Sequence, residues 1–206
     1  MTRAITKLSR PSKIACCILT AVIFSAYSAN YLSEWDFEHM DFNAMESAPS
    51  AIHWFGTDSV GRDLYVRTMR GTSVSLMVAL LSTMISLAIG VLWGTLSGYL
   101  GGRVDEVMMR VVDILYSLPF ILVVVLLTVV FGPNLYLLFA SLGAIYWLDM
   151  ARIVRGQTLR LKAAPFISAA KIQGATTLNI IAVHILPNIR SPIIIYGTIT
   201  IPAIIL

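Results

Sequence analysis

The stretch GTSVSLMVALLSTMISLAIGVLWGTLSGYLGG, residues 71–102, decides the fold, because it contains no charged residue and no histidine. A helix of about 20 apolar residues crosses the roughly 30 Å hydrocarbon core of a bilayer. Three more stretches share this property, at residues 14–33, 114–148 and 191–206. The sequence therefore predicts an all-α, polytopic transmembrane helical bundle.

The composition of the whole chain agrees with a membrane protein. Of its 206 residues, 57% are hydrophobic and 13% are charged, whereas soluble domains carry roughly 25% charged residues. The formal net charge is +4, but the charges lie in separate blocks between the apolar stretches, which argues against a nucleic-acid-binding protein. The expected surroundings are a lipid bilayer.

The number of spans follows from the lengths of these stretches. The third is too long for one crossing and carries the turn signal Gly-Pro-Asn at 132–134, so we expect helices at 109–131 and 135–154, with Pro119 kinking the first. The last offers only residues 192–206, about 22 Å of helix. We expect four full spans plus a partial fifth. Either the last helix does not cross or the chain is C-terminally truncated, and truncation is favoured.

Basic residues predict the orientation, because loops rich in Lys and Arg stay in the cytoplasm. Segment 34–70 carries seven acidic residues against three arginines, which suits the outside face, whereas the charged residues of 152–190 are all basic. The N-terminus is expected in the cytoplasm, since it carries no acid and four basic residues, Arg3, Lys7, Arg10 and Lys13. A cleaved signal peptide at 1–29 is the alternative, because Ala-Tyr-Ser at 26–28 resembles a cleavage site.

The segment expected outside contains the motif FGTDSVGRDL, residues 55–64. Its Gly, Thr, Asp and Ser residues predict a tight turn whose side chains bond backbone amides. Asp63, or Asp58 one turn earlier, is expected to begin a short helix that runs to Gly71 along the membrane surface. Two roles stay open, a structural turn and a grip on a partner or substrate, for the candidate residues Gly56, Thr57, Asp58, Gly61, Arg62 and Asp63.

The basic segment predicts two short helices. Pro165 can open the first and Gly174 can end it. Thr176 or Thr177 can cap the second, which we expect to end at Pro187-Asn188. Such an element needs a partner surface, because it is expected to expose the apolar side chains of Phe166, Ile167, Ile172 and Ile180.

The sequence carries no signature of a metal site or an enzyme. The histidines His39, His53 and His184 are far apart and lack the Cys/His spacing of zinc sites. No Gly-x-x-x-x-Gly-Lys-Ser/Thr motif is present, so the chain is not expected to bind or hydrolyse ATP. Protease and hydrolase motifs are also absent. We therefore predict no catalytic residue, no metal and no cofactor.

Several motifs together resemble a known family. Ala169-Ala170-x-x-x-Gly174, followed after eleven residues by Leu-Pro at 186–187, looks like the EAA loop of binding-protein-dependent ABC importers. The 55–63 motif resembles the dipeptide, oligopeptide and nickel branch of their permeases. With the stretches at 97–105, 116–120 and 147–157, the chain is most similar to the C-type membrane subunit of the oligopeptide permease, from about Trp54 to its end.

The resemblance implies a type I ABC importer permease fold, and the apolar stretches and the charge distribution predict a division of the chain. Its parts are a cytoplasmic tail at 1–13, a first transmembrane helix at 14–32, a periplasmic loop at 33–72 and an incomplete permease core at 73–206. Within the core, the resemblance implies an ATPase-coupling loop at 156–190. Its candidate residues are Ser168, Ala169, Ala170, Gly174, His184, Leu186 and Pro187. Ser168 departs from the family, which usually has Glu there, and His184 replaces an aliphatic residue of the general pattern.

The resemblance also implies partners: a homologous second permease subunit, two ABC ATPase subunits and a periplasmic peptide-binding protein.

Oppositely charged residues three apart, Arg110 with Asp113 and Asp149 with Arg152, are expected to pair at the cytoplasmic ends of spans. A face of small residues is expected to contact the second permease subunit. This face consists of Gly90, Gly94 and Gly98.

The predicted function is that of a transmembrane permease subunit of an ATP-driven peptide importer in the cell inner membrane. The cargo stays open between dipeptides, oligopeptides and nickel complexes, with oligopeptides favoured by similarity. A truncated, non-transporting fragment of such a permease and a membrane assembly or interaction protein are the alternatives.

Overall fold

The computed structural model describes residues 9–206, which are mostly helical and contain no strand apart from one isolated bridge between Thr57 and Asp63. The chain divides into two compact units between Leu76 and Met77. The predicted all-α class is confirmed. The elements are α2 (Arg10–Leu32), η1 (Phe42–Ala44), α3 (Leu64–Leu100), α4 (Gly102–Tyr116), α5 (Phe120–Phe131), α6 (Leu135–Lys162), α7 (Pro165–Ile172), α8 (Thr177–Asn179), η2 (Ile180–Ile185) and α9 (Leu186–Ile205).

Four helical segments of the described chain are long and apolar enough to cross a membrane. They are Arg10–Ala29, Leu64–Leu100, Leu135–Lys162 and Thr177–Ile205, and a fifth crossing is possible if the bent pair α4 and α5 forms one span. The last segment is longer than the predicted 192–206, because the helical chain already begins at Thr177. Of the predicted tail at 1–13, residues 1–8 lie outside the described part of the chain, and residues 10–13 belong to α2.

The predicted helix at 109–131 is broken rather than kinked. Helices α4 and α5 meet at 74°, and Pro119 lies just before α5 instead of inside a helix. Proline has no amide proton to donate and disfavours helical dihedrals in the residue before it. Together these effects end α4 at Tyr116.

In the first unit, the end of α2 packs near the start of α3. Ala29, Tyr65 and Val66 are buried there, surrounded by Trp35, Phe37 and Met69. The predicted short surface helix ending at Gly71 is wrong, because α3 continues to Leu100. A single helical glycine costs only about 1 kcal/mol, and the apolar residues that follow Gly71 extend the helix.

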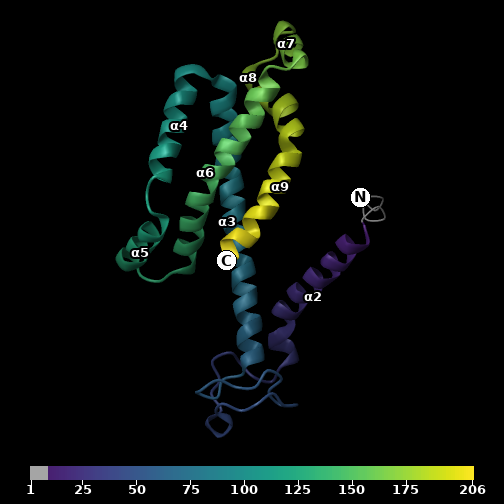
Figure 1. The fold of residues 1–206 in the computed structure, drawn as a ribbon, viewed down its shortest axis with the longest axis vertical. Coiled ribbons are helices and arrows are strands. Elements are labelled where there is room, and N and C mark those ends of the chain that lie inside the picture. The colour runs from purple at the N-terminus through teal and green to yellow at the C-terminus, as the bar shows by residue number, and fades with distance from the viewer. Residues whose placement is uncertain (1–8) are drawn as a thin grey trace. The chain divides into compact units, whose positions relative to one another are not determined.

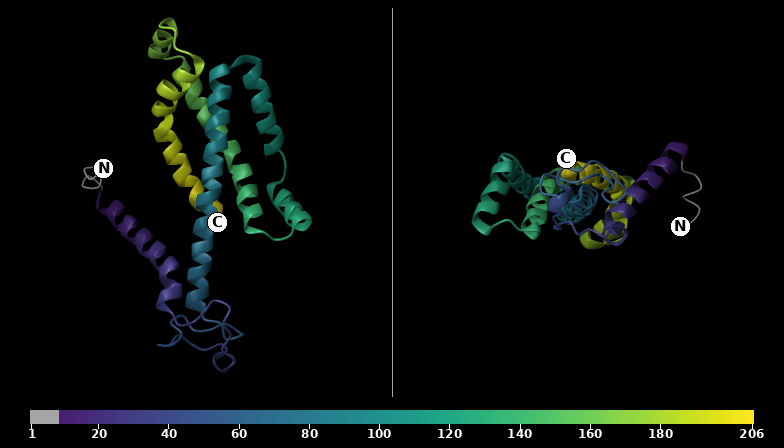
Figure 2. Two further views of the ribbon diagram at one scale, coloured as in Figure 1. Left: turned by 180° about the vertical axis from the view of Figure 1, so that it is seen from behind. Right: turned by 90° about the horizontal axis from the view of Figure 1, so that it is seen from below.

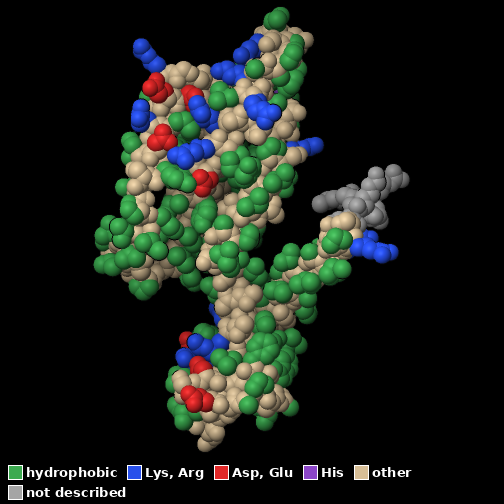
Figure 3. Space-filling view, viewed as in Figure 1, with side chains coloured by type: hydrophobic (Ala, Val, Ile, Leu, Met, Phe, Trp, Pro, Cys, Tyr) green, Lys and Arg blue, Asp and Glu red, His purple; other side chains and the backbone are tan. Residues whose placement is uncertain are grey.

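In the second unit, α3 and α4 form a hairpin whose turn lies at the same end as α7 and α8 (Figures 1 and 2). The turn uses Gly101 and Gly102, with φ of +69° and +56°. The α5–α6 connection lies at the opposite end. Lys and Arg side chains gather over the end that carries α7, whereas hydrophobic side chains cover the region of α5 (Figure 3).

The small residues of α3 pack against α6 of the same chain. A Cβ atom on Gly90 would come within 2.6 Å of Met150 Cβ, and one on Gly98 within 2.9 Å of the Arg155 carbonyl oxygen. One on Gly94 would collide with the Ala151 carbonyl oxygen. The prediction that this face contacts a second permease subunit is therefore wrong, since α6 already occupies it.

Candidate functional site

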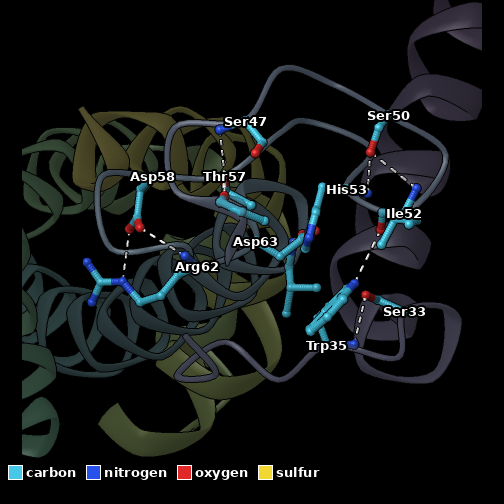
Figure 4. A network of polar contacts seen from close by, with 12 residues as sticks. Ser33, Trp35, Ser47, Ser50, Ile52, His53, Thr57, Asp58, Arg62 and Asp63 are labelled. Carbon is cyan, nitrogen blue, oxygen red and sulfur yellow. Dashed lines mark hydrogen bonds and ion pairs between the residues drawn. The ribbon is translucent and has the colours of Figure 1, made fainter. Parts of the chain in front are cut away.

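The 33–63 loop is organised around the carboxylate of Asp58 (Figure 4). Its Oδ1 accepts hydrogen bonds from the amides of Val60 and Arg62, each at 3.0 Å. Its Oδ2 accepts one from Arg62 Nε at 2.9 Å. The backbone hydrogen bond from Arg62 is the main cause that lowers the pKa of Asp58, with Val60 and the Arg62 side chain adding to it. The predicted turn with side chains bonded to amides is therefore present.

Asp63 begins helix α3, one of the two alternatives predicted. Its Oδ1 accepts a hydrogen bond from the amide of Val66 at 2.9 Å, which satisfies a donor at the helix start. Its Oδ2 lies 2.9 Å from Nδ1 of His53, and both residues are buried. The ring of Trp35 lies 4.7 Å from that of His53. No spacing rule joins His53 to Asp63, so the sequence did not predict this buried pair.

The remaining motif residues also bond or contact the loop itself. The Thr57 hydroxyl accepts from the Ser47 amide at 2.9 Å and donates to the Ala44 carbonyl. Gly56 and Gly61 have φ of +76° and +75°, and a Cβ on either would collide with loop backbone. The structure thus gathers the six candidate residues into one turn whose polar groups bond within the loop or to the start of α3. This geometry favours the structural role over the grip on a partner.

The 163–190 loop begins as predicted. Pro165 opens α7, Gly174 follows it with φ of +82°, and the Thr176 side chain accepts a hydrogen bond from the Asn179 amide at 3.3 Å. The predicted helix end at Pro187-Asn188 is wrong, because the chain passes from η2 into α9 without a break.

The wide turns of η2 explain how the chain passes Pro187. Residues Ile180–Ile185 form a π-helix, and the Leu186 amide bonds the Ile181 carbonyl five residues earlier. Pro187 then occupies the first turn of α9, a position that proline favours. Residue propensities did not predict this π-helix. Such insertions are frequent at functional sites.

The 163–190 loop has a buried face and an exposed face. Ile167 and Ile180 are 0% and 1% exposed, so their predicted exposure is wrong. They belong to a core with Tyr99, Ile185 and Ile189. The exposed face carries large apolar side chains in addition to the exposed Ser168. These are Phe166, Ile172, Leu178 and Val183, with exposures of 44%, 87%, 76% and 59%.

A hollow of about 500 Å³ lies within this loop. Four of the predicted coupling residues, Ala169, Ala170, Gly174 and His184, line it together with Phe166. Leu186 instead packs against the core, and Pro187 is exposed. The structure therefore brings most, but not all, of the candidate residues to one place.

A charged cluster lies where the base of this loop meets the α3–α4 turn. Arg155 donates to the two carboxylate oxygens of Asp105 at 2.5 and 2.6 Å, and Ser97 also donates to Asp105. The ammonium groups of Lys162 and Lys171 lie 5.8 and 5.4 Å from the centre of the Tyr99 ring. The stretches 97–105 and 147–157, which were separate motifs in the sequence, thus meet in one cluster.

The charge pairs expected within single helices are wrong. Arg152 of α6 donates to Asp113 of α4 at 2.9 Å, so the pair joins two helices. Neither Arg110 nor Asp149 forms an ion pair within the described residues. The described chain also contains no group of three His, Cys, Asp or Glu residues that could hold a metal ion.

Helices of this length and hydropathy define a multi-pass membrane protein. The family model described as "binding-protein-dependent transport system inner membrane component" matches residues 90–206. The chain belongs to this family. Its relatives are named as transport permease proteins, which agrees with the prediction of a transport component rather than an enzyme.

Similar proteins cover most of this chain. It is 48% identical over 191 residues to the oligopeptide transport system permease protein OppC of Escherichia coli strain K12, covering 92% of this chain and 63% of that protein. The OppC protein of Salmonella typhimurium is 51% identical over 86% of this chain and 60% of its own length. The dipeptide transport system permease protein DppC of Bacillus subtilis is 42% identical over 90% of this chain and 58% of its own length. The chain thus spans about three fifths of the length of these relatives.

Proposed function

We propose that this chain is a membrane-spanning subunit of an ATP-driven peptide importer, with oligopeptides as the favoured cargo. The names of its relatives support the cargo class. Its N-terminus and the 163–190 loop face the cytoplasm in this proposal, because basic residues dominate both.

The loop at 156–190 couples ATPase movement to the membrane helices. The observation that carries this role is the exposed apolar face of Phe166, Ile172 and Leu178 on an element whose other face is buried in the helix bundle. A partner that covers this face gains hydrophobic contact area. A movement of the partner is transmitted from this loop to α3 and α6, because Ile167 and Ile180 pack beside Tyr99 and Val154.

Other subunits supply what the chain lacks. The sequence has no phosphate-binding loop, so ATP hydrolysis is assigned to two separate ATPase subunits. A homologous second permease subunit completes the path, and a periplasmic peptide-binding protein delivers the cargo on the side of the 33–63 loop. Asp58 and Asp63 then order that loop, since each carboxylate bonds a backbone amide through one oxygen and a neighbouring side chain through the other.

Cysteine cross-linking tests the coupling role. Cys16 and Cys17 are exposed and are first replaced by Ser. Ile172→Cys is expected to cross-link to a co-expressed ATPase subunit, and the yield should change when ATP is added. Val129→Cys, on α5 and 76% exposed, is the matched control and should give no cross-link. Labelling of Ile172→Cys only from the periplasm would contradict both the orientation and the coupling role.

A further inference from the structure

Asp149 is exposed on the candidate span α6 and has no polar partner among the described residues. Its carboxylate makes no hydrogen bond or ion pair with any other described residue. The cation nearest to it in sequence, Arg152, is held by Asp113 at 2.9 Å and lies 4.3 Å from the centre of the Tyr116 ring. Within the described chain, Asp149 is thus a carboxylate whose expected counter-ion is engaged elsewhere.

Asp149 lines two cavities, one on each flank of α6. The first, of about 420 Å³, is open on one side and is lined by residues of α4, α5 and α6 and by Leu118 of the connection between α4 and α5. The second, of about 320 Å³, lies between α6 and α9. Tyr146 lines both, its hydroxyl donating to the Ala203 carbonyl at 2.8 Å. Tyr116 and Phe120 line the first, and Arg152, Tyr196 and Thr200 line the second.

The chemistry of the first cavity favours a cation, because Asp149 is the only charged residue that lines it, whereas Arg152 lines the second. An acidic residue inside a membrane span is costly unless it faces water, a substrate or a positive partner. Aromatic ring faces attract ammonium and guanidinium groups, and Tyr116 already contacts Arg152 in this way. The rest of the first cavity is mostly aliphatic and aromatic, so it accepts the apolar part of a ligand.

We propose that Asp149, with Tyr116 and Tyr146, binds a primary ammonium group of the cargo as it passes α6. The group is the α-amino group of a peptide or the side chain of a lysine within it. The peptide nature of the cargo rests on the proposed function, whereas the preference for an ammonium group rests on the carboxylate and the rings alone.

Photo-cross-linking of the full chain in phosphatidylcholine nanodiscs tests this site. The cationic probe is the tripeptide amide Ala-benzoylphenylalanine-Lys. The neutral probe is the same peptide N-acetylated and with norleucine in place of Lys. In the unchanged chain, the cationic probe should label the walls of the two cavities at least about tenfold more than the neutral probe, because one charge pair in an apolar site contributes that much.

Three variants sharpen the result. Asp149→Asn should lower labelling by the cationic probe to the level of the neutral one, and Asp149→Glu should retain the preference. Glu106→Gln is the matched control, since Glu106 is exposed on α4 and lines neither cavity, and it should change nothing. Equal labelling of Asp149→Asn and the unchanged chain would overturn the proposal.

Two further outcomes separate this inference from the proposed function. If phosphatidylethanolamine in the nanodisc abolishes the labelling, a lipid headgroup is the occupant and the cargo site is refuted. If the chain with its partner subunits imports no peptide while the preference for the cationic probe persists, the proposed function fails and the ammonium site stands. If import proceeds but Asp149→Asn leaves the labelling unchanged, this inference alone fails.

Discussion

The 33–63 loop and the 163–190 loop fix their backbones in different ways. In the first, buried polar side chains such as Thr57 and Asp63 bond the loop itself or the start of α3. In the second, the described side-chain hydrogen bonds are few, and apolar residues such as Ile167 and Ile180 provide the buried contacts. The hydrogen bonds within the 33–63 loop fix its conformation without a partner. The 163–190 loop is buried on one apolar face only, so its other apolar face is available to a partner.

Glycine substitutions should show the largest contrast between the two loops. A Cβ on Gly61 would collide with the Asp41 backbone, so Gly61→Ala should destabilise the 33–63 loop by about 4 kcal/mol from left-handed strain and displaced backbone. Gly174 also has positive φ, but nothing surrounds its Cβ position, so Gly174→Ala should cost about 1 kcal/mol. Amide hydrogen exchange in each loop measures both. Equal destabilisation by Gly61→Ala and Gly174→Ala would contradict the expected difference between the loops.

Removal of the helix caps should give the next largest effect. Asp63→Ala removes the cap of α3 and leaves buried His53 without its partner, which together should cost about 3 kcal/mol. Thr176→Ala removes only an exposed cap and should cost about 1 kcal/mol. Thermal unfolding in nanodiscs compares them. His53→Phe in the Asp63→Ala background should recover part of the loss, and a lack of recovery would show that the pair is not the cause.

The sequence predicted the features that depend on local chemistry. The helical class, the cap at Thr176, the stop at Gly174 and the turn around Asp58 each follow from residues close in sequence, and the structure contains all of them. The candidate residues of both loops were found because their spacing matches a family pattern. Their role in coupling stays a prediction.

The features that depend on tertiary contact were not predicted. Arg152 prefers Asp113 on another helix to Asp149 on its own. The face of Gly90 and Gly94 suits any close neighbour, and only the fold determines that this neighbour is α6. The helix runs through Pro187 because a π-helix precedes it, which no residue preference indicates.

A substitution on the exposed face of the 163–190 loop should leave stability nearly unchanged. Ile172 is 87% exposed, so Ile172→Ser should alter the unfolding free energy by no more than about 0.5 kcal/mol. Under the proposed function, it should nevertheless weaken co-purification of the ATPase subunit. Phe42→Ser, at a 67% exposed position of the 33–63 loop, is the control that should leave co-purification intact. Equal losses for both variants would remove the distinction between the loops.

Protonation of a carboxylate should have the smallest effect, and between the two loops it concerns only the 33–63 loop. The pKa of Asp58 is lowered mainly by the Arg62 backbone amide, so its carboxylate stabilises the folded turn at pH above the ordinary carboxyl range. This contribution is lost as the pH falls through the lowered pKa. Residues 163–190 contain no carboxylate, so they have no contribution of this kind to lose. The carboxyl ¹³C shift of Asp58 should titrate with a midpoint below the ordinary carboxyl pKa. In Arg62→Gln this midpoint should be only slightly higher than in the unchanged chain, because the amide of residue 62 remains. A midpoint at or above the ordinary value would show that the turn does not hold this carboxylate.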